Sequence, residues 1–430
     1  MQEQRTAYDR SLSHDGGVAY TVTCVRCKSK SDTESYQTEC AICHGALEFH
    51  YTDPLHGVHR TRKSMWKYGA LLPVRDDGNI ISLGEGNTPL VRARLYGDRK
   101  VYLKNETANP TGSHKDRALS IGITKAIEFG FDTCMLYSDG STALSSAAYA
   151  ARAGIRNIAI TPANAPDSRL LPLMVYNSIV LEYQGAAADA LSWVHETCGA
   201  AGIYETSTYR RANPYESEGA KTISYEIFED LGSVPDCIIV PVGGGGTLSG
   251  IWRGFVDLKR RGRTDRLPRL VGVLPAGYRL LEVGLEEGAT TEEDLKALAT
   301  FAVPTTLQAK LAMSLPPDGI EAIAAIRDSG GCFLFASDQE ALRSQQRLGA
   351  REGIYAEISA AVSIVALDRL IANSLIRRDE IAVALISGSG FRETGELGSL
   401  VPLKKTLIGP ATDVAELTSL LKQLRPVERR

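Results

Sequence analysis

The sequence lacks any long hydrophobic run and any strong excess of charge. No apolar stretch approaches the roughly 18 residues that cross a membrane, and residues 1–17 are too polar for a secretory signal. We therefore expect a cytoplasmic protein without a membrane partner. The net charge of −3 argues against a nucleic-acid partner, because phosphate binding needs clustered lysine and arginine. With 43% hydrophobic and 23% charged residues, a disordered or fibrous chain is excluded.

The eight cysteines form two sets with different expected roles. Two Cys-x-x-Cys pairs, separated by twelve residues, lie near the N-terminus: Cys24, Cys27, Cys40 and Cys43. Each pair supplies two thiolates, which predicts a tetrahedral structural zinc site in a ribbon-like segment over residues 1–50. The spacer is shorter than the usual range of about 15–20 residues, and a redox or vestigial role is the alternative. The others are expected to be reduced core thiols: Cys134, Cys198, Cys237 and Cys332.

From residue 82 onward, strand-like and helix-like segments alternate. Apolar, β-branched segments predict strands over 101–104, 133–138, 157–161, 178–183, 236–242, 269–274, 332–336 and 381–387. Helical spacing occurs between them, over 113–130, 141–153, 216–231, 247–260, 338–349 and 359–370. This alternation predicts an α/β fold of parallel sheets covered by helices, with ligands at the carboxyl ends of the strands. Residues 277–306 fit least well and are expected to form an acidic helical excursion.

A turn that opens a predicted helix, NPTGSHKDR over Asn109–Arg117, contains a candidate nucleophile. Ser113 is suited to cap the helix, which places Lys115 in the first turn, near the positive end of the helix dipole. That field, with partial burial, lowers the pKa of an amine and makes its neutral form available near pH 7. The alternative is an ordinary solvated lysine beside Asp116.

Two further turns follow predicted buried strands. In PVGGGGTLSG, a glycine run and a threonine lead into a helix: Gly243, Gly244, Gly245, Gly246 and Thr247. Converging backbone N–H groups and the helix N-terminus predict a phosphate site, and a merely flexible turn is the alternative. The run matches neither a Walker loop nor the dinucleotide fingerprint. In the second turn, Ser387 ends a strand and can hydrogen-bond a ring nitrogen of a bound cofactor.

A lysine nucleophile, a phosphate site and a hydroxyl for a heterocyclic nitrogen together favour pyridoxal phosphate as the cofactor. Six motifs occur in the order found in fold-type II pyridoxal-phosphate enzymes: SLGEGNTPL (82–90), KNETANPTGSHKDR (104–117), AAYAARAG (147–154), PVGGGGTLSG (241–250), EGIYAEISAA (352–361) and ISGSG (386–390). The chain resembles this family from Ser82 to Arg392. Within the family it most resembles the threonine synthases, some of which carry a cysteine-bearing N-terminal segment.

The resemblance implies two three-layer domains with parallel sheets, as in the β-subunit of tryptophan synthase. A large cofactor-binding domain would comprise residues 51–119 and 216–430, and a smaller α/β domain would be inserted over 120–215. The zinc-ribbon-like segment 1–50 would precede both. The cofactor would lie in the cleft between the domains, and the assembly would be a homodimer.

The resemblance also assigns roles to residues of the candidate turns. Lys115 would form the Schiff base with pyridoxal phosphate and then remove the substrate's α-proton. Gly243–Thr247 would hold the cofactor phosphate, and Ser387 would face the pyridine nitrogen. His114 replaces the usual phenylalanine, and a phosphate contact or packing is favoured over acid–base catalysis.

The chain departs from the family pattern in the loop Ser138–Ser145. The residues implied to bind the substrate carboxylate are Ser138, Asp139, Gly140 and Thr142. Ser141 replaces the family's asparagine near the cofactor's 3′-oxygen and has a shorter reach. Asp139 brings negative charge to a site for a carboxylate. Either it turns away as a helix cap, or the substrate differs.

The expected function is a pyridoxal-phosphate-dependent lyase with a small amino-acid substrate. The threonine synthase version converts O-phosphohomoserine and water to threonine and phosphate. One alternative is β-replacement or β-elimination on an O-activated serine-type substrate in a specialised pathway. Another is a non-catalytic homologue that acts as a binding protein through its ribbon.

Overall fold

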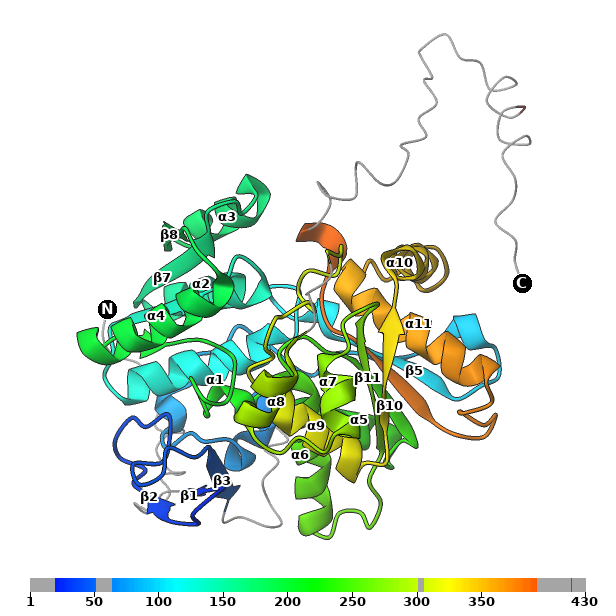
Figure 1. Ribbon diagram of the computed structural model, residues 1–430, viewed down its shortest axis with the longest axis horizontal. Coiled ribbons are helices and arrows are strands. Elements are labelled where there is room, and N and C mark those ends of the chain that lie inside the picture. The colour runs from blue at the N-terminus through cyan, green and yellow to red at the C-terminus, as the bar shows by residue number, and fades with distance from the viewer. Residues whose placement is uncertain (1–19, 52–63, 301–304, 393–418, 420–430) are drawn as a thin grey trace, which may run out of the picture. The chain divides into compact units, whose positions relative to one another are not determined.

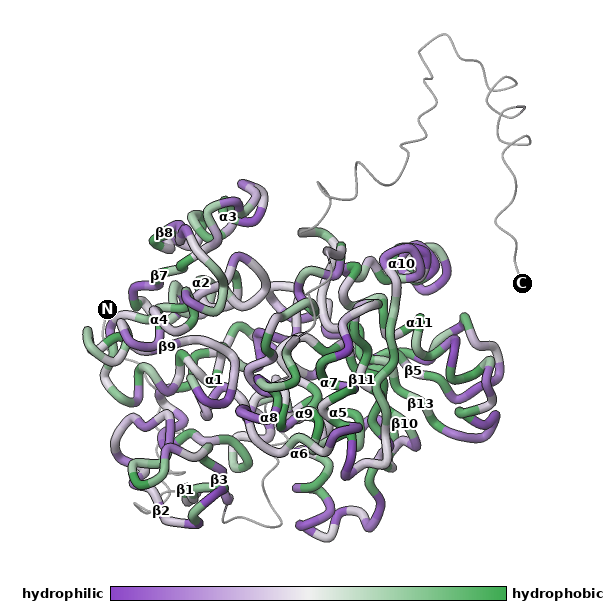
Figure 2. Tube along the Cα trace, in the orientation of Figure 1, coloured by the Kyte–Doolittle hydropathy of each residue, from purple (hydrophilic) through white to green (hydrophobic). Residues whose placement is uncertain are grey.

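The computed structural model describes residues 20–51, 64–300, 305–392 and 419 (Figure 1). Among these residues, a six-stranded sheet lies within the largest buried apolar cluster. Its strands are β4 (Leu90–Arg92), β5 (Val101–Asn105), β10 (Cys237–Pro241), β11 (Arg269–Pro275), β12 (Cys332–Ala336) and β13 (Ala382–Ile386). The order is β12-β11-β10-β13-β5-β4, parallel except at the β4–β5 edge. Every residue of β10 and β13 is buried, which explains their continuous apolar sequences (Figure 2).

A second parallel sheet is inserted in the chain between β5 and β10. Its strands are β6 (Thr133–Tyr137), β7 (Arg156–Pro162), β8 (Ile179–Tyr183) and β9 (Tyr204–Glu205). They are arranged in the order β8-β7-β6-β9. A third sheet, antiparallel with the order β2-β1-β3, comprises β1 (Tyr20–Cys24), β2 (Lys30–Ser31) and β3 (Leu47–Tyr51).

Helices connect the parallel strands. They are α1 (Lys115–Glu128), α2 (Ser141–Ala153), α3 (Asp167–Val175), α4 (Ala187–Ala201), α5 (Lys221–Leu231), α6 (Gly246–Arg260), α7 (Leu280–Glu286), α8 (Glu292–Leu298), α9 (Gly319–Asp328), α10 (Asp338–Glu352) and α11 (Ile358–Ala372). Local sequence fixes several ends. In α10, Ser337 and Glu340 form a reciprocal capping box, and Gly353 ends the helix at φ +69°. Figure 2 shows α10 as largely hydrophilic, whereas α11 is mostly buried.

The N-terminal ribbon shares a hydrophobic core with α1. Tyr20, Leu47 and Phe49 belong to the same buried cluster as Trp66 and Ile121. The short 3₁₀ helix Met65–Leu71 provides part of this cluster. The ribbon is therefore joined to the rest of the unit by apolar packing and not only by the chain.

The predicted α/β fold of parallel sheets is confirmed, with differences in detail. The helix expected over 216–231 begins as a 3₁₀ turn, Glu216–Glu218, before α5. The unassigned segment 277–306 provides α7 and α8, and its residues 301–304 lie outside the described residues. The sequence analysis did not predict β4 or β9, which have three and two residues.

Contacts divide the chain into two units, residues 1–392 and 393–430, and every strand and helix named here belongs to the first. The division of that unit into a large and an inserted small domain stays a prediction. In the described part of the chain, none of the helices combines the length and apolar character needed to span a bilayer.

Candidate active site

The residues predicted to bind the cofactor and the substrate line one cavity of about 1040 Å3. Three segments of its wall directly follow strands: Ser138 after β6, Val242 after β10 and Ser387 after β13. The cavity therefore lies at the carboxyl ends of strands of both parallel sheets, where ligands collect in α/β folds. The predicted residues among its lining are His114, Lys115, Ser138, Asp139, Gly140, Ser141, Thr142, Gly243, Gly244, Gly245, Gly246, Thr247 and Ser387.

Lys115 is the first residue of α1, and its amine reaches the cavity wall formed by Thr208. The Lys115 Nζ donates a hydrogen bond of 2.7 Å to Thr208 Oγ1. Burial lowers the pKa of the Lys115 amine, against the opposing influence of nearby carboxylates. A larger fraction of this amine is therefore neutral near pH 7 than for a solvated lysine.

The prediction that Ser113 caps α1 is wrong by one residue. His114 occupies the cap position and makes no side-chain capping bond. Ser113 instead pairs with Gly388 in a β-bridge, and its Oγ accepts the Lys115 N–H at 3.3 Å. The bridge ties the lysine-bearing turn to the end of β13.

His114 is a neutral ring that connects three parts of the cavity. Its Nδ1 and its backbone N both lie 3.0 Å from Ser387 O. A carbonyl only accepts, so Nδ1 carries the ring proton. Burial and the charge of Lys115 lower the pKa of His114 to about 4, so Nε2 is unprotonated and accepts the Thr247 hydroxyl at 3.0 Å. This geometry favours positioning over proton donation.

A segment before α9, residues 305–318 and here called the strap, packs against the glycine run. A β-carbon at Gly243 would lie 2.4 Å from Lys310 O, and one at Gly245 would lie 2.4 Å from Asp318 O. The Asp318 N–H donates to Gly244 O at 2.8 Å. Side chains at these positions would displace the strap, and Gly245 also has φ +96°. The glycines are thus needed for close backbone packing.

The same run fits the phosphate of a cofactor. Helix α6 has 15 residues and begins at Gly246, and its cap residue Gly245 provides no side-chain bond to the first-turn N–H groups. These N–H donors and the helix dipole suit a phosphate next to the cavity that holds Lys115. The donor set and the amine together fit pyridoxal phosphate.

A buried acid lies behind Ser387. Glu357 precedes α11, and a β-carbon at Gly388 would lie 2.8 Å from its carboxyl carbon. The carboxylate forms an ion pair with Lys310 Nζ of the strap. Glu357 is the cap residue of α11 but makes no side-chain capping bond.

The Ser138–Ser145 loop holds its unusual acid in an ion pair. Asp139 Oδ2 lies 2.8 Å from Arg169 Nη1 on α3. Of the two alternatives left open for Asp139, the helix cap is wrong, because Gly140 is the cap residue of α2 and offers no side chain. Ser138 Oγ accepts the Gly140 N–H at 3.1 Å, and Ser141 begins the helix. Arg169 compensates the negative charge beside the expected carboxylate site.

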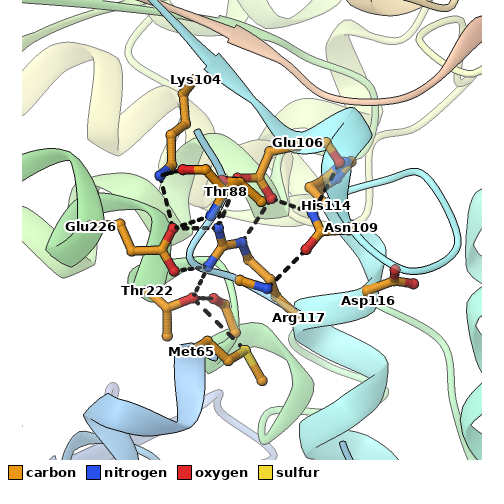
Figure 3. A network of polar contacts seen from close by, with 12 residues as sticks. Met65, Thr88, Lys104, Glu106, Asn109, His114, Asp116, Arg117, Thr222 and Glu226 are labelled. Carbon is orange, nitrogen blue, oxygen red and sulfur yellow. Dashed lines mark hydrogen bonds and ion pairs between the residues drawn. The ribbon is translucent and has the colours of Figure 1, made fainter. Parts of the chain in front are cut away.

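A buried ionic network fixes the segments around Lys115 (Figure 3). Arg117, fully buried in α1, pairs with Glu106 and Glu226 at 2.7 Å each. Lys104 Nζ lies 2.8 Å from Glu226, and Thr88 donates to Glu106 at 2.6 Å. Figure 3 shows Lys104 of β5, Arg117 of α1 and Glu226 of α5 converging. Glu106 joins them from the short turn that follows β5, and Thr88 joins them from the segment before β4. The network holds the start of the lysine-bearing helix against the six-stranded sheet.

The four N-terminal cysteines form a separate cluster in the ribbon. Their sulfur atoms all lie within 4.8 Å of one another. The separations include 3.4 Å between Cys24 and Cys43 and 3.7 Å between Cys27 and Cys40. Tetrahedral coordination with Zn–S bonds of about 2.3 Å places the sulfur atoms about 3.8 Å apart. The donor set therefore fits a zinc ion.

Sequence reasoning missed several polar residues of the site. Thr208 accepts a hydrogen bond from the Lys115 amine, and Arg169 compensates the negative charge of Asp139. Lys310 lines the cavity from the strap. None lies in a glycine-rich or charged motif. Only Asp139 gave a signal, because an acid at an anion site requires a cation nearby.

A parallel α/β fold, a half-buried lysine at a helix start and a glycine run in the same cavity are together the features of a pyridoxal-phosphate-binding enzyme. The chain belongs to the family described as pyridoxal-phosphate dependent enzyme, which it matches over residues 81–388. It is therefore a pyridoxal-phosphate-dependent enzyme, and the matched relatives support a lyase.

Two relatives named threonine synthase match most of the chain. The protein from Methanocaldococcus jannaschii is 34% identical over 86% of this chain and 92% of its own length. The protein from Methanosarcina acetivorans is 33% identical over 86% and 91%. The crystal structure of O-ureido-L-serine synthase matches the fold with a TM-score of 0.59 at 22% identity, covering 78% of this chain and 96% of that one.

Proposed function

We propose that this enzyme is a threonine synthase that converts O-phosphohomoserine and water to threonine and phosphate. The observation that carries the proposal is that the Lys115 amine and the glycine run line one cavity. The relatives named threonine synthase support the choice of substrate. When bound, pyridoxal phosphate supplies the electron sink that stabilises negative charge at the substrate's α-carbon.

Each cofactor contact is assigned to a group of the chain. Lys115 would bind the cofactor covalently, and the N–H groups of Gly243–Thr247 would bind its phosphate. Ser387 would offer a neutral hydroxyl to the ring nitrogen, and His114 links Ser387 to Thr247 through hydrogen bonds. Ser141 would lie near the cofactor's 3′-oxygen.

Lys115 also acts as the base. Burial favours its neutral amine, which would take the α-proton of the substrate at Nζ. Thr208 Oγ1 orients Nζ. The N–H groups at the start of α2, next to Ser138, Gly140 and Thr142, bind the substrate carboxylate, and Arg169 removes the repulsion of Asp139.

A second candidate is elimination or replacement at the β-carbon of an O-activated serine. The loop Ser138–Ser145 favours it, because Ser141 is shorter than the asparagine of related enzymes and Asp139 adds a negative charge beside the expected carboxylate site. Both candidates use the same lysine and phosphate loop.

Phosphate release separates the two functions. We expect the holoenzyme to release phosphate from O-phosphohomoserine and to form threonine in equal amount, measured by a phosphate assay and amino-acid analysis. Release from O-phosphoserine alone contradicts the proposal and supports the second candidate. Release of phosphate from neither substrate contradicts threonine synthesis, and only the family assignment then remains.

We also propose that Cys24, Cys27, Cys40 and Cys43 bind one structural zinc ion. Because Cys24 and Cys40 belong to the cluster that includes Ile121 of α1, loss of the metal should loosen the core beside the lysine-bearing helix.

Cys40→Ser is expected to abolish stoichiometric zinc, measured by elemental analysis, and to lower the melting temperature by at least about 5 °C. Cys332→Ser, at a half-buried thiol outside the cluster, serves as the control and should retain the metal. Zinc-free wild-type protein with an unchanged melting temperature contradicts the site.

A further inference from the structure

We infer that Lys310 binds the anionic group at the end of the substrate's side chain, an inference that rests on the proposed function because a phosphate substrate brings that group. Lys310 lines the cavity from the strap, and its side chain is 24% exposed. Its ammonium group is thus sufficiently desolvated to interact strongly with an anion, and sufficiently exposed for a substrate to reach it.

The backbone of Lys310 is fixed on both sides. Its carbonyl oxygen fits against Gly243, where a β-carbon would lie 2.4 Å away. Upstream, Gln308 Nε2 donates to Ala336 O at 2.9 Å. Downstream, the Asp318 N–H donates to Gly244 O at 2.8 Å. These bonds hold the strap along the glycine run, so the side chain of Lys310 leaves from a defined point.

The side chain reaches toward the substrate loop. A β-carbon at Gly140 would lie 3.8 Å from Lys310 Cε, which places the side chain next to the start of α2. The ammonium group also pairs with Glu357, whose side chain is 5% exposed. That pair directs the ammonium group between Gly140 and the end of β13.

The other cations of the cavity are less suited to this role. Lys115 is assigned to the cofactor. Arg211 and Lys296 both pair with Glu292, and their side chains are 52% and 55% exposed, where charge interactions are weak. Among the described lining residues, Lys310 is the one Lys or Arg that is both mostly buried and unassigned to the cofactor.

The two anionic groups of the substrate would then bind at two positively polarised sites of the cavity. The α-carboxylate binds the N–H groups at the start of α2, and the side-chain phosphate binds the ammonium of Lys310 beside that loop. Glu357 shares the ammonium and becomes a positioning residue. A neutral amino acid would use only the first feature, so Lys310 selects for an acidic side chain.

The test compares two unreactive amino acids on the holoenzyme. One side chain ends in a phosphonate, and the other, that of norleucine, is neutral. Binding is read from the change in cofactor absorbance. Lys310→Met is expected to weaken phosphonate binding about 10- to 100-fold and norleucine binding less than about 3-fold, because only the charged contact is lost. Lys310→Arg should restore most of the phosphonate affinity. Lys296→Met is the control and should change neither.

Three results would overturn the inference. In the first, Lys310→Met weakens the binding of both ligands equally, which assigns Lys310 to the α-carboxylate or to a structural role. In the second, Lys310→Met leaves phosphonate binding unchanged. In the third, the wild-type enzyme binds norleucine but not the phosphonate. The proposed function fails separately. Enzyme that binds the phosphonate through Lys310 yet releases no phosphate from O-phosphohomoserine rejects threonine synthesis and retains the anion site.

Discussion

Lys115→Ala is expected to abolish covalent attachment of the cofactor and to lower turnover by at least about 10³-fold. Two roles are lost together, because the same Nζ binds the cofactor and takes the α-proton. The fold should persist, since the amine makes a hydrogen bond with Thr208 and, within the described part of the chain, forms no ion pair. Turnover, cofactor absorbance and thermal unfolding are measured on the same preparation.

Borohydride reduction of the wild-type protein, followed by peptide mass mapping, identifies the attached lysine. The adduct is expected on Lys115 and absent from the Lys115→Ala variant. A small primary amine added to the variant should restore part of the lost proton transfer. An adduct on another lysine, or a variant with unchanged cofactor absorbance, contradicts the assignment.

Thr208→Val separates the two roles of the amine. It removes the acceptor of the Lys115 hydrogen bond and retains side-chain volume. We expect the cofactor to remain attached while turnover falls, because Nζ loses its orientation for proton transfer.

The sequence predicts the parts of the site that lie in short motifs after strands. Lys115 opens a helix, whereas the glycine run and Ser387 each follow the end of a strand. The parallel fold brings these turns together around one cavity. Local pattern is sufficient for such residues because the fold class determines where they meet.

The remaining residues depend on packing that no local pattern encodes. Lys310 reaches the cavity only because the glycine run admits the strap, and Arg169 meets Asp139 through the packing of α3 beside α2. The capping residue of α1 was misplaced for a related reason. The β-bridge of Ser113 with Gly388 is a contact between distant segments, and Ser113 lies one residue before the cap position while its Oγ still accepts the Lys115 N–H.

Arg117→Met is expected to destabilise the protein by about 3–5 kcal/mol. The methionine retains much of the volume but leaves Glu106 and Glu226 in a site where both are fully buried. Lys104 remains near Glu226, so one of the two carboxylates loses most of its compensation. Urea unfolding of the holoenzyme at neutral pH measures the loss. Arg347→Met removes a partly exposed ion pair with Asp368 and should cost less than about 1 kcal/mol.

The acid dependence of stability tests the same network. Although burial alone raises it, the charges of Arg117 and Lys104 lower the pKa of Glu226 to about 2, from an ordinary value of 4.5. The folded state therefore gains stability from this group above pH 4.5, and loses it as pH falls from 4.5 toward 2. Arg117→Met raises the folded-state pKa, so acid unfolding should begin at a higher pH. If the variant and wild type unfold at the same pH and urea concentration, the pairs in Figure 3 do not stabilise the fold around Lys115.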